Sequence, residues 1–472
     1  MGRLKQNMIM VWTRVGTRFL PFADAATPEV PLSRLLRLSL IQVSVAMSIV
    51  LLIGTLNRVM IVELDVPAAL VGIMVSLPLL FAPFRAVIGF RSDNHRSELG
   101  WRRVPFIYRG TMVQFGGLAI MPFALLVLSG TGNAASVPAW VGQMAAAFAF
   151  LLVGAGLHTT QTVGLALATD LTPDHLQPKV VGLMYVMLTL GTIGSALVFG
   201  LMLSDYSPGR LVQVIQGAAI VTLVLNGIAT WKQEARGGHR RGAARAEPGF
   251  LDSWRRFAEG SDAVPRLVAL GLGTMAFTME DILLEPYGGQ ILHLAVADTT
   301  MLTATLAIGG LVGFGLASYV LGRGANPFRM ASHGALVGLP AFSLVIMSAP
   351  AGSPGLFALG TWLIGFGAGL FSHGTLTATM NQAPANQAGL ALGAWGAVQA
   401  SAAGVAVALG GIIRDAVAHF APAADMGPAA GYHLVYLVEI ALLLATLAAM
   451  APLVRKTCAA DGTNRLRDTI SG

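Results

Sequence analysis

Long apolar runs recur along this sequence from residue 35 to residue 454. A helix needs about 20 mostly apolar residues to cross a bilayer, and about twelve runs reach that length. They lie near residues 35–57, 66–90, 104–129, 140–169, 178–204, 211–231, 265–293, 299–322, 330–350, 355–381, 387–413 and 431–454. Only 11% of the residues are charged, against roughly a quarter in soluble domains. The chain is therefore predicted to be an all-α integral membrane protein of about twelve transmembrane helices.

The basic residues are concentrated at the two chain ends, in the 91–109 stretch and in the 232–266 segment. The alternate loops hold three arginines, Arg58, Arg210 and Arg414. Because basic loops stay on the cytoplasmic side of a membrane, both termini are predicted to be cytoplasmic and the number of spans to be even. A net charge of +7 spread over loops and tails in this way favours anionic lipid as a partner and argues against nucleic acid.

One long hydrophilic segment divides the apolar runs into two groups of six. The groups share short sequences, since Gly154-Ala-Gly-Leu157 in the fourth run returns as Gly367-Ala-Gly-Leu370 in the tenth. Two pseudo-symmetric six-helix bundles are the plan of the major facilitator superfamily. The expected segments are an N-terminal segment 1–34 (a solvated tail or an interfacial helix), a bundle 35–231, a basic cytoplasmic linker 232–264, a bundle 265–454 and a cytoplasmic tail 455–472.

Glycines spaced four residues apart give three predicted helices a small face. The pairs are Gly309 and Gly313, Gly365 and Gly369, and Gly389 and Gly393. Faces of this kind let helices approach closely in lipid. The sequence leaves open whether they serve packing alone or also leave a slot for a flat ligand.

Ionisable side chains inside spanning helices are costly, so each is a functional candidate. In the seventh run, Asp281 and Glu285 are four residues apart, and Glu280 lies beside them. Two carboxylates on one helix face favour a retained proton or a bound cation, and Pro286 can break the helix to line a cavity. The alternative is a solvated position near the outer interface. Arg85 in the second run either snorkels to the loop surface or makes a buried ion pair.

Three histidines are candidate pigment ligands. His158 and His373 follow glycines in the fourth and tenth runs, and His293 lies near an outer helix end. A neutral imidazole can ligate the metal of a tetrapyrrole, and small neighbours leave room for the ring; the alternative is a hydrogen bond to a neighbouring helix. The sequence contains no phosphate-binding loop, zinc motif or nucleophile elbow, so we expect no protein metal site and no enzyme activity.

The basic loop between the second and third runs resembles the superfamily motif G-x-x-x-D-R-x-G-R-R. Gly89 and Asp93 keep the spacing of that motif. Arg102 and Arg103 come four residues late, with Arg96 between. The resemblance implies an expanded gating loop on the cytoplasmic side.

Four stretches are similar to the PucC/LhaA family, the bacteriochlorophyll delivery branch of the major facilitator superfamily. They are L-N-R-V-M-I-V-E-L (56–64), F-R-S-D-N-H-R-S-E-L-G-W-R-R-V-P (90–105), T-T-Q-T-V-G-L-A-L-A-T-D-L (159–171) and E-D-I-L-L-E-P-Y-G-G (280–289). The resemblance extends from about Phe19 to the twelfth run.

The resemblance implies a non-enzymatic assembly factor for light-harvesting antenna complexes in the inner photosynthetic membrane of a bacterium. Bacteriochlorophyll would be the carried ligand, and the implied partners are antenna polypeptides, the pigment synthesis machinery and membrane lipids. The resemblance does not choose between the core and the peripheral antenna as client. The fold plan and the paired carboxylates support a second hypothesis, a proton-coupled secondary transporter of a small solute.

Overall fold

The computed structural model describes residues 30–80, 85, 88, 91–92, 101–130, 136–173, 176–234, 263–382, 388–420 and 429–471. Within these residues the regular structure is helical, with 11 helices long and apolar enough to span a membrane and one shorter apolar helix, Ala68–Leu79. The prediction of an all-α membrane protein with about twelve spans is therefore confirmed.

The first span is one helical rod from Leu32 to Glu63. It consists of α2 (Leu32–Leu38), α3 (Leu40–Ile49), the π-helical segment η2 (Val50–Thr55), α4 (Leu56–Arg58) and a second π-helical segment, η3 (Val59–Glu63). π-Helical turns inside longer helices are rare and often mark functional sites. The rest of the N-terminal half comprises α5 (Ala68–Leu80), α7 (Val104–Leu128), α8 (Ala139–Asp170), α9 (Gln177–Met202) and α10 (Pro208–Thr230).

The C-terminal half begins with a broken span, α12 (Ala263–Ala276), the 3₁₀ segment η6 (Met279–Ile282) and α13 (Leu284–Gln290). The helices that follow are α14 (Val296–Leu321), α15 (Pro327–Ser348), α16 (Pro354–Gln382), α17 (Ala388–Phe420) and α18 (Ala430–Ser471). Because α18 is continuous to Ser471, most of the predicted cytoplasmic tail, 455–472, continues the last helix beyond the candidate span Ala430–Lys456.

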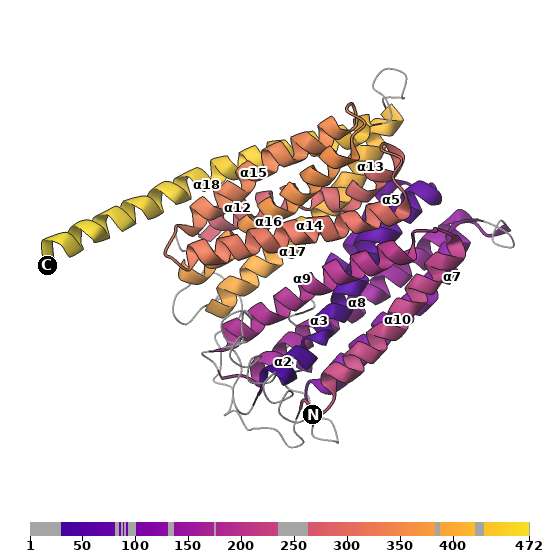
Figure 1. Ribbon diagram of the computed structural model, residues 1–472, viewed down its shortest axis with the longest axis horizontal. Coiled ribbons are helices and arrows are strands. Elements are labelled where there is room, and N and C mark those ends of the chain that lie inside the picture. Colours follow the sequence, from indigo (N-terminus) through magenta and orange to yellow (C-terminus); the bar gives the residue numbers. More distant parts are fainter. Residues whose placement is uncertain are drawn as a thin grey trace, which may run out of the picture.

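The two halves lie side by side, with the N-terminal half in indigo to magenta and the C-terminal half in orange to yellow (Figure 1). They meet where α5 packs on α17 and α9 packs on α14. We call the end where α2 begins and α10 ends the basic end; Arg34 and Arg37 there bind Gln233 and the Trp231 carbonyl. The other end, where the first span ends at Glu63, is called the distal end. That the basic end faces the cytoplasm stays a prediction.

Two of the predicted glycine pairs bring α14 and α16 into backbone contact. A Cβ atom at Gly309 or Gly313 would overlap the backbone of α16, and one at Gly365 or Gly369 would overlap the backbone of α14. Van der Waals packing of this kind is a main source of helix association in lipid, so these glycines serve close packing. Side chains around the third pair, at 389 and 393, lie outside the described part of α17.

Candidate functional site

The break in the seventh span exposes backbone carbonyl groups to the other half of the protein. Pro286 has no N–H, so it leaves the carbonyl of Ile282 without its usual helical donor. The Asn57 side-chain amide of the first span donates to the carbonyls of Asp281 and Ile282, at 3.1 and 3.5 Å. The predicted helix break is therefore present, and an amide from the N-terminal half uses the acceptors that it frees.

Arg58 lies buried in α4, 4% exposed, and not in a loop as the distribution of charges suggested. Its Nη1 pairs with Glu63 at 2.5 Å, and its Nη2 donates to the Leu294 carbonyl at 3.1 Å. The guanidinium also lies against Gly289, where a Cβ atom would come within 3.1 Å of Nη2. The position inside the helix is possible because a carboxylate and a carbonyl compensate the buried charge.

Glu285 is buried between the two halves, with an exposed fraction of 3%. Its Oε1 accepts a hydrogen bond from the Thr303 hydroxyl at 2.6 Å, and a Cβ atom at Gly54 in η2 would lie only 2.7 Å from the same oxygen. Its Oε2 makes no hydrogen bond to any described residue. Glu285 is thus not at a solvated outer interface, which was the alternative for the carboxylates of this span.

A second set of contacts joins α17 to the N-terminal half. The Asp415 carboxylate accepts from the backbone N–H of Ala69, at the start of α5, at 2.7 Å, where a carboxylate satisfies an otherwise free helix donor. Arg414 pairs with Asp415 at 2.8 Å and donates to Gln290, which also accepts from the Tyr432 hydroxyl. Arg414 therefore lies inside α17 and not in a loop, because Asp415 and Gln290 satisfy its guanidinium.

These contacts form what we call the distal seam, defined by Asn57, Arg58, Ala69, Asp415 and Leu294. They link the first span and α5 to the broken seventh span and α17, and they lie toward the distal end of the protein. The hydroxyls of Thr55 and Thr300 add a 3.4 Å contact nearby. The halves are therefore held together at this end by hydrogen bonds as well as by packing.

An acidic cluster lies beside the seam, within the C-terminal half. Glu280 is 1% exposed, and Glu439 of α18 is 0% exposed. The packing of α18 against η6 places Glu439 beside Glu280 and Asp281. Asp281 and Glu285 do not share one helix face, because the span breaks between η6 and α13 and gives them different neighbours. Our sequence reading missed Glu439, although a lone carboxylate in the middle of the twelfth run was a signal for it.

Arg85 neither snorkels nor makes an ion pair with any described residue. Its Nε donates to the Thr162 hydroxyl at 2.9 Å, and its Nη2 donates to Gln161 at 2.7 Å. Both partners lie on α8, and His158 is one helical turn before Thr162 on the same face. Arg85 is thus a mostly buried cation that is hydrogen-bonded to two neutral oxygen atoms, close to the candidate ligand His158.

The three candidate histidines are not brought together by the structure, and no metal-binding cluster occurs within its described part. The Nδ1 atoms of His158 and His373 are buried and make no hydrogen bond to described residues. The His373 ring contacts Phe314, with ring centroids 4.2 Å apart. His293 is exposed in the turn between α13 and α14 and has a φ of 55°.

The glycines before these histidines do not leave open space for a ring. A Cβ atom at Gly154 would overlap Pro78 of α5, and one at Gly156 would overlap the backbone of Gln114. At Gly374, next to His373, the backbone of Ala331 fills the space, at 2.7 Å from a Cβ atom. Close helix packing therefore explains these glycines in this conformation.

Two arginines of the basic loop are bound within the N-terminal half. Arg102 and Arg103 both contact Oδ2 of Asp170, at 2.5 and 2.9 Å. The Glu234 carboxylate accepts the backbone N–H groups of Arg102, Arg103 and Val104, at 2.8 to 3.1 Å. It therefore caps the start of α7. The remaining residues of the predicted gating loop, Gly89, Asp93 and Arg96, lie outside the described residues.

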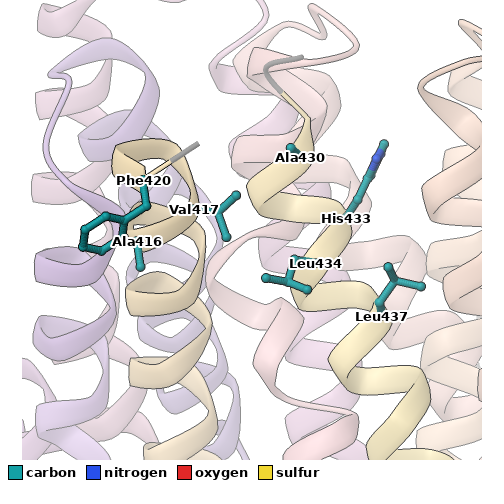
Figure 2. Close-up of a pocket in the computed structure, with 7 residues that line it drawn as sticks. All are labelled: Ala416, Val417, Phe420, Ala430, His433, Leu434 and Leu437. Carbon is teal, nitrogen blue, oxygen red and sulfur yellow. The ribbon is translucent and has the colours of Figure 1, made fainter. Parts of the chain in front are cut away.

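An apolar groove opens between α17 and α18 on the surface of the distal end, with a volume of about 610 Å³. Figure 2 shows Leu434 of α18 turned toward Val417 of α17, and His433 is the one polar side chain among the residues drawn that line the groove. The Nε2 atom of His433 lies 3.3 Å from the Tyr287 hydroxyl. The groove is therefore lined mainly by aliphatic and aromatic carbon.

Comparison with known proteins identifies relatives along nearly the whole chain. The sequence model of the family described as PUCC protein matches residues 55–458. Protein PucC of Rhodovulum sulfidophilum is 61% identical over 420 residues, which cover 88% of this chain and 92% of that protein. Protein PucC of Cereibacter sphaeroides is 56% identical and covers 98% of this chain and 99% of that protein. A more distant relative in Rhodobacter capsulatus, named bacteriochlorophyll synthase 44.5 kDa chain, is 28% identical and covers 93% of this chain and 98% of that protein.

The fold recurs among solved transporters of the major facilitator type. The crystal structure of a mutant of the nucleoside transporter NupG has a TM-score of 0.66 at 14% identity, covering 88% of this chain and 98% of that one. At this identity the likeness concerns the fold alone.

Proposed function

Because this chain belongs to the PucC family, we propose that it is a membrane assembly factor for light-harvesting antenna complexes. It would deliver bacteriochlorophyll, chaperone antenna subunits, or do both. The observation that carries the proposal is the family match over residues 55–458, which includes both halves and the distal seam. The name of the distant relative, a bacteriochlorophyll synthase chain, supports pigment as the cargo. No catalytic step is part of the proposal.

His158 is the favoured ligand for a magnesium tetrapyrrole. Its buried Nδ1 is unbonded within the described structure, so an imidazole nitrogen is available. Arg85 binds only neutral oxygens one turn away, and its guanidinium suits a carbonyl or carboxylate substituent of the ring. His373 offers a similar nitrogen but is packed on Phe314, and His293 is exposed. Since packing fills the glycine notches in this conformation, α5 and α8 would have to separate for a pigment to enter.

The test is to purify the protein in mild detergent from pigment-producing cells and record its absorption spectrum. We expect bound bacteriochlorophyll in the wild type, loss of most of it in His158→Ala, and retention in the control His293→Ala. Wild-type protein without pigment, together with unchanged antenna levels in a deletion strain, would rule the proposal out. Retention of pigment in His158→Ala and its loss in His373→Ala would move the ligand to α16.

Antenna polypeptides are the proposed protein partners, and membrane lipids surround the rest of the helices. The groove between α17 and α18 offers apolar surface of the kind that a single antenna helix would cover. Mild-detergent co-purification with identification of bound proteins tests the partnership. A Val417→Trp change that fills the groove should reduce antenna recovery, whereas unchanged recovery would place the contact elsewhere.

One observation favours a second function, the proton-coupled transport of a small solute. Glu285 is buried where the halves meet and has one oxygen without a hydrogen bond to the described residues. Replacing Asp281 by Asn and Glu285 by Gln should then abolish solute uptake without unfolding the protein. Unchanged uptake in this double variant would remove the reason for the hypothesis.

A further inference from the structure

Carboxyl groups from two separate spans lie at the depth expected for the middle of the bilayer. Glu280 lies ten residues before the end of α13, and Glu439 lies nine residues after the start of α18. At about 1.5 Å per residue both are roughly 15 Å from the distal end. The hydrocarbon core is about 30 Å thick, so the cluster lies near its midplane, where water is scarce.

Polar atoms in this cluster lack hydrogen-bond partners within the described structure. They are Glu280 Oε2, both carboxyl oxygens of Glu439 and the hydroxyl of Tyr436. Tyr436 is 0% exposed and lies three residues before Glu439 on α18, so the two side chains share one face of that helix. A fully buried and unbonded hydroxyl on the same helix face as Glu439, together with three unbonded carboxyl oxygens, indicates that a ligand of these oxygens belongs here.

The charged groups around the cluster do not supply that ligand. On η6 the neighbour is Asp281, and the tyrosines facing Tyr436 are Tyr287 of α13 and Tyr432 of α18. The nearby basic groups on α17 and α18 are engaged elsewhere, since Arg414 pairs with Asp415 and His433 contacts the Tyr287 hydroxyl. No lysine, arginine or histidine among the described residues forms a salt bridge with Glu280, Asp281 or Glu439.

Burying several ionised carboxylates without a cation is very costly. A proton is the smallest ligand that removes this cost, because a protonated carboxyl group becomes a donor to the other unbonded oxygens. The described residues also include no cluster of three or more side chains placed to hold a metal ion. We propose that Glu280, Asp281 and Glu439 form a proton-binding site whose occupancy controls the distal seam.

The coupling follows from the position of Asn57. Its amide binds the carbonyls of Asp281 and Ile282, within the same η6 segment that carries Glu280 and Asp281. Protons bound to the carboxyl groups let η6 rest against α18 without like-charge repulsion. When the protons leave, repulsion between the carboxylates displaces η6 and weakens the hydrogen bonds between η6 and Asn57 of the first span. Proton release thus opens the distal seam, and proton binding closes it, whether or not the chain carries pigment.

Proton occupancy is tested with dicyclohexylcarbodiimide, which modifies protonated carboxyl groups in apolar surroundings, followed by peptide mass spectrometry. We expect modification at Glu280 or Glu439 that falls as the pH is raised, and its loss at the substituted position in Glu280→Gln or Glu439→Gln. The matched control is Asp205→Asn, since Asp205 is exposed between α9 and α10 and makes none of the hydrogen bonds of the distal seam, and it should leave this labelling unchanged. Absence of modification at Glu280 and Glu439 at every pH would overturn the proposal.

The state of the seam is read from a single cysteine, Thr300→Cys, in a Cys458→Ala background. Thr300 is buried and faces Thr55 across the seam. Its labelling by a maleimide should rise with pH by roughly fivefold or more, the low end of typical coupling between sites, after correction for thiol ionisation with an unfolded control. Adding Glu280→Gln and Glu439→Gln, which keep side-chain shape without the charge, should remove this rise. A rise that persists in those variants, or no rise in the parent, would overturn the coupling.

Discussion

The sharpest prediction compares two glycines on one helix. Gly313 and Gly315 are both in α14, but a Cβ atom at Gly313 would lie 3.0 Å from the carbonyl carbon of Phe366 and closer still to its oxygen. At Gly315 no atom lies within 4 Å of such a Cβ, apart from the neighbouring backbone of α14 itself. Gly313→Ala should therefore force α14 and α16 apart, whereas Gly315→Ala should not.

The size of the effect follows from the geometry. Carbon atoms pack best at about 3.5–4.0 Å, so the contact with the carbonyl carbon alone requires the two helices to separate by at least roughly 0.5–1 Å, which forfeits a quarter to a half of each affected contact. Overpacking of this kind typically costs about 1–3 kcal/mol. Both substitutions gain roughly 0.5–1 kcal/mol from the better helix propensity of alanine, so that gain cancels in the comparison. Gly313→Ala should be about 1–3 kcal/mol less stable than Gly315→Ala.

The assay is thermal unfolding of both variants in the same detergent, followed by circular dichroism and by the loss of the monodisperse peak in size-exclusion chromatography. Gly315→Ala should unfold at or slightly above the wild-type temperature, and Gly313→Ala clearly below it. Equal unfolding temperatures for the two variants would show that the α14–α16 contact is looser than the structure indicates, and the packing argument would be refuted.

Three further outcomes are expected. Arg58→Ala should lower thermal stability by roughly 2 kcal/mol, less than the loss of a fully buried pair because Glu63 is partly solvated; an unchanged melting curve would contradict this. Glu234→Ala should cost about 1–2 kcal/mol by leaving three N–H groups at the start of α7 uncapped, and wild-type stability would argue against the cap. Burial, and then the nearby Glu63, raise the pKa of Tyr206 between α9 and α10, so its ionisation in a wild-type minus Tyr206→Phe absorbance titration should occur above the usual value of about 10.

The number and type of spans could be predicted from the sequence because the hydrocarbon core of a membrane offers no water to the backbone. The N–H and C=O groups of a spanning segment must therefore be hydrogen-bonded within the segment, so a sufficiently long apolar run is expected to form an α-helix. Arg58 and Arg414 were wrongly predicted to lie in loops because each apolar run was taken to end at its first charged residue. Their compensating carboxylates, Glu63 and Asp415, are close in sequence, and that spacing was a usable sign of a charge retained inside a helix.

Much of the site depends on contacts between residues far apart in the chain. The carboxylate that caps α7 comes from Glu234, 130 residues after Val104, and no local sequence pattern predicts a contact over this distance in the chain. Likewise, Asp281 meets Glu439 only because η6 packs against α18. Helical spacing linked Asp281 to Glu285 instead, since that rule holds only while the helix is unbroken.

The distal seam has an asymmetric tolerance to mutation. Asn57 and Arg58 end on main-chain oxygens of Asp281, Ile282 and Leu294, and a carbonyl oxygen remains whatever side chain its residue carries. The accepting half can therefore vary in sequence at 282 and 294 while the bonds persist, but the donating half must keep its amide and its guanidinium. Random mutagenesis that selects for a loosened interface should consequently return lesions at 57 and 58 far more often than at the residues they hold.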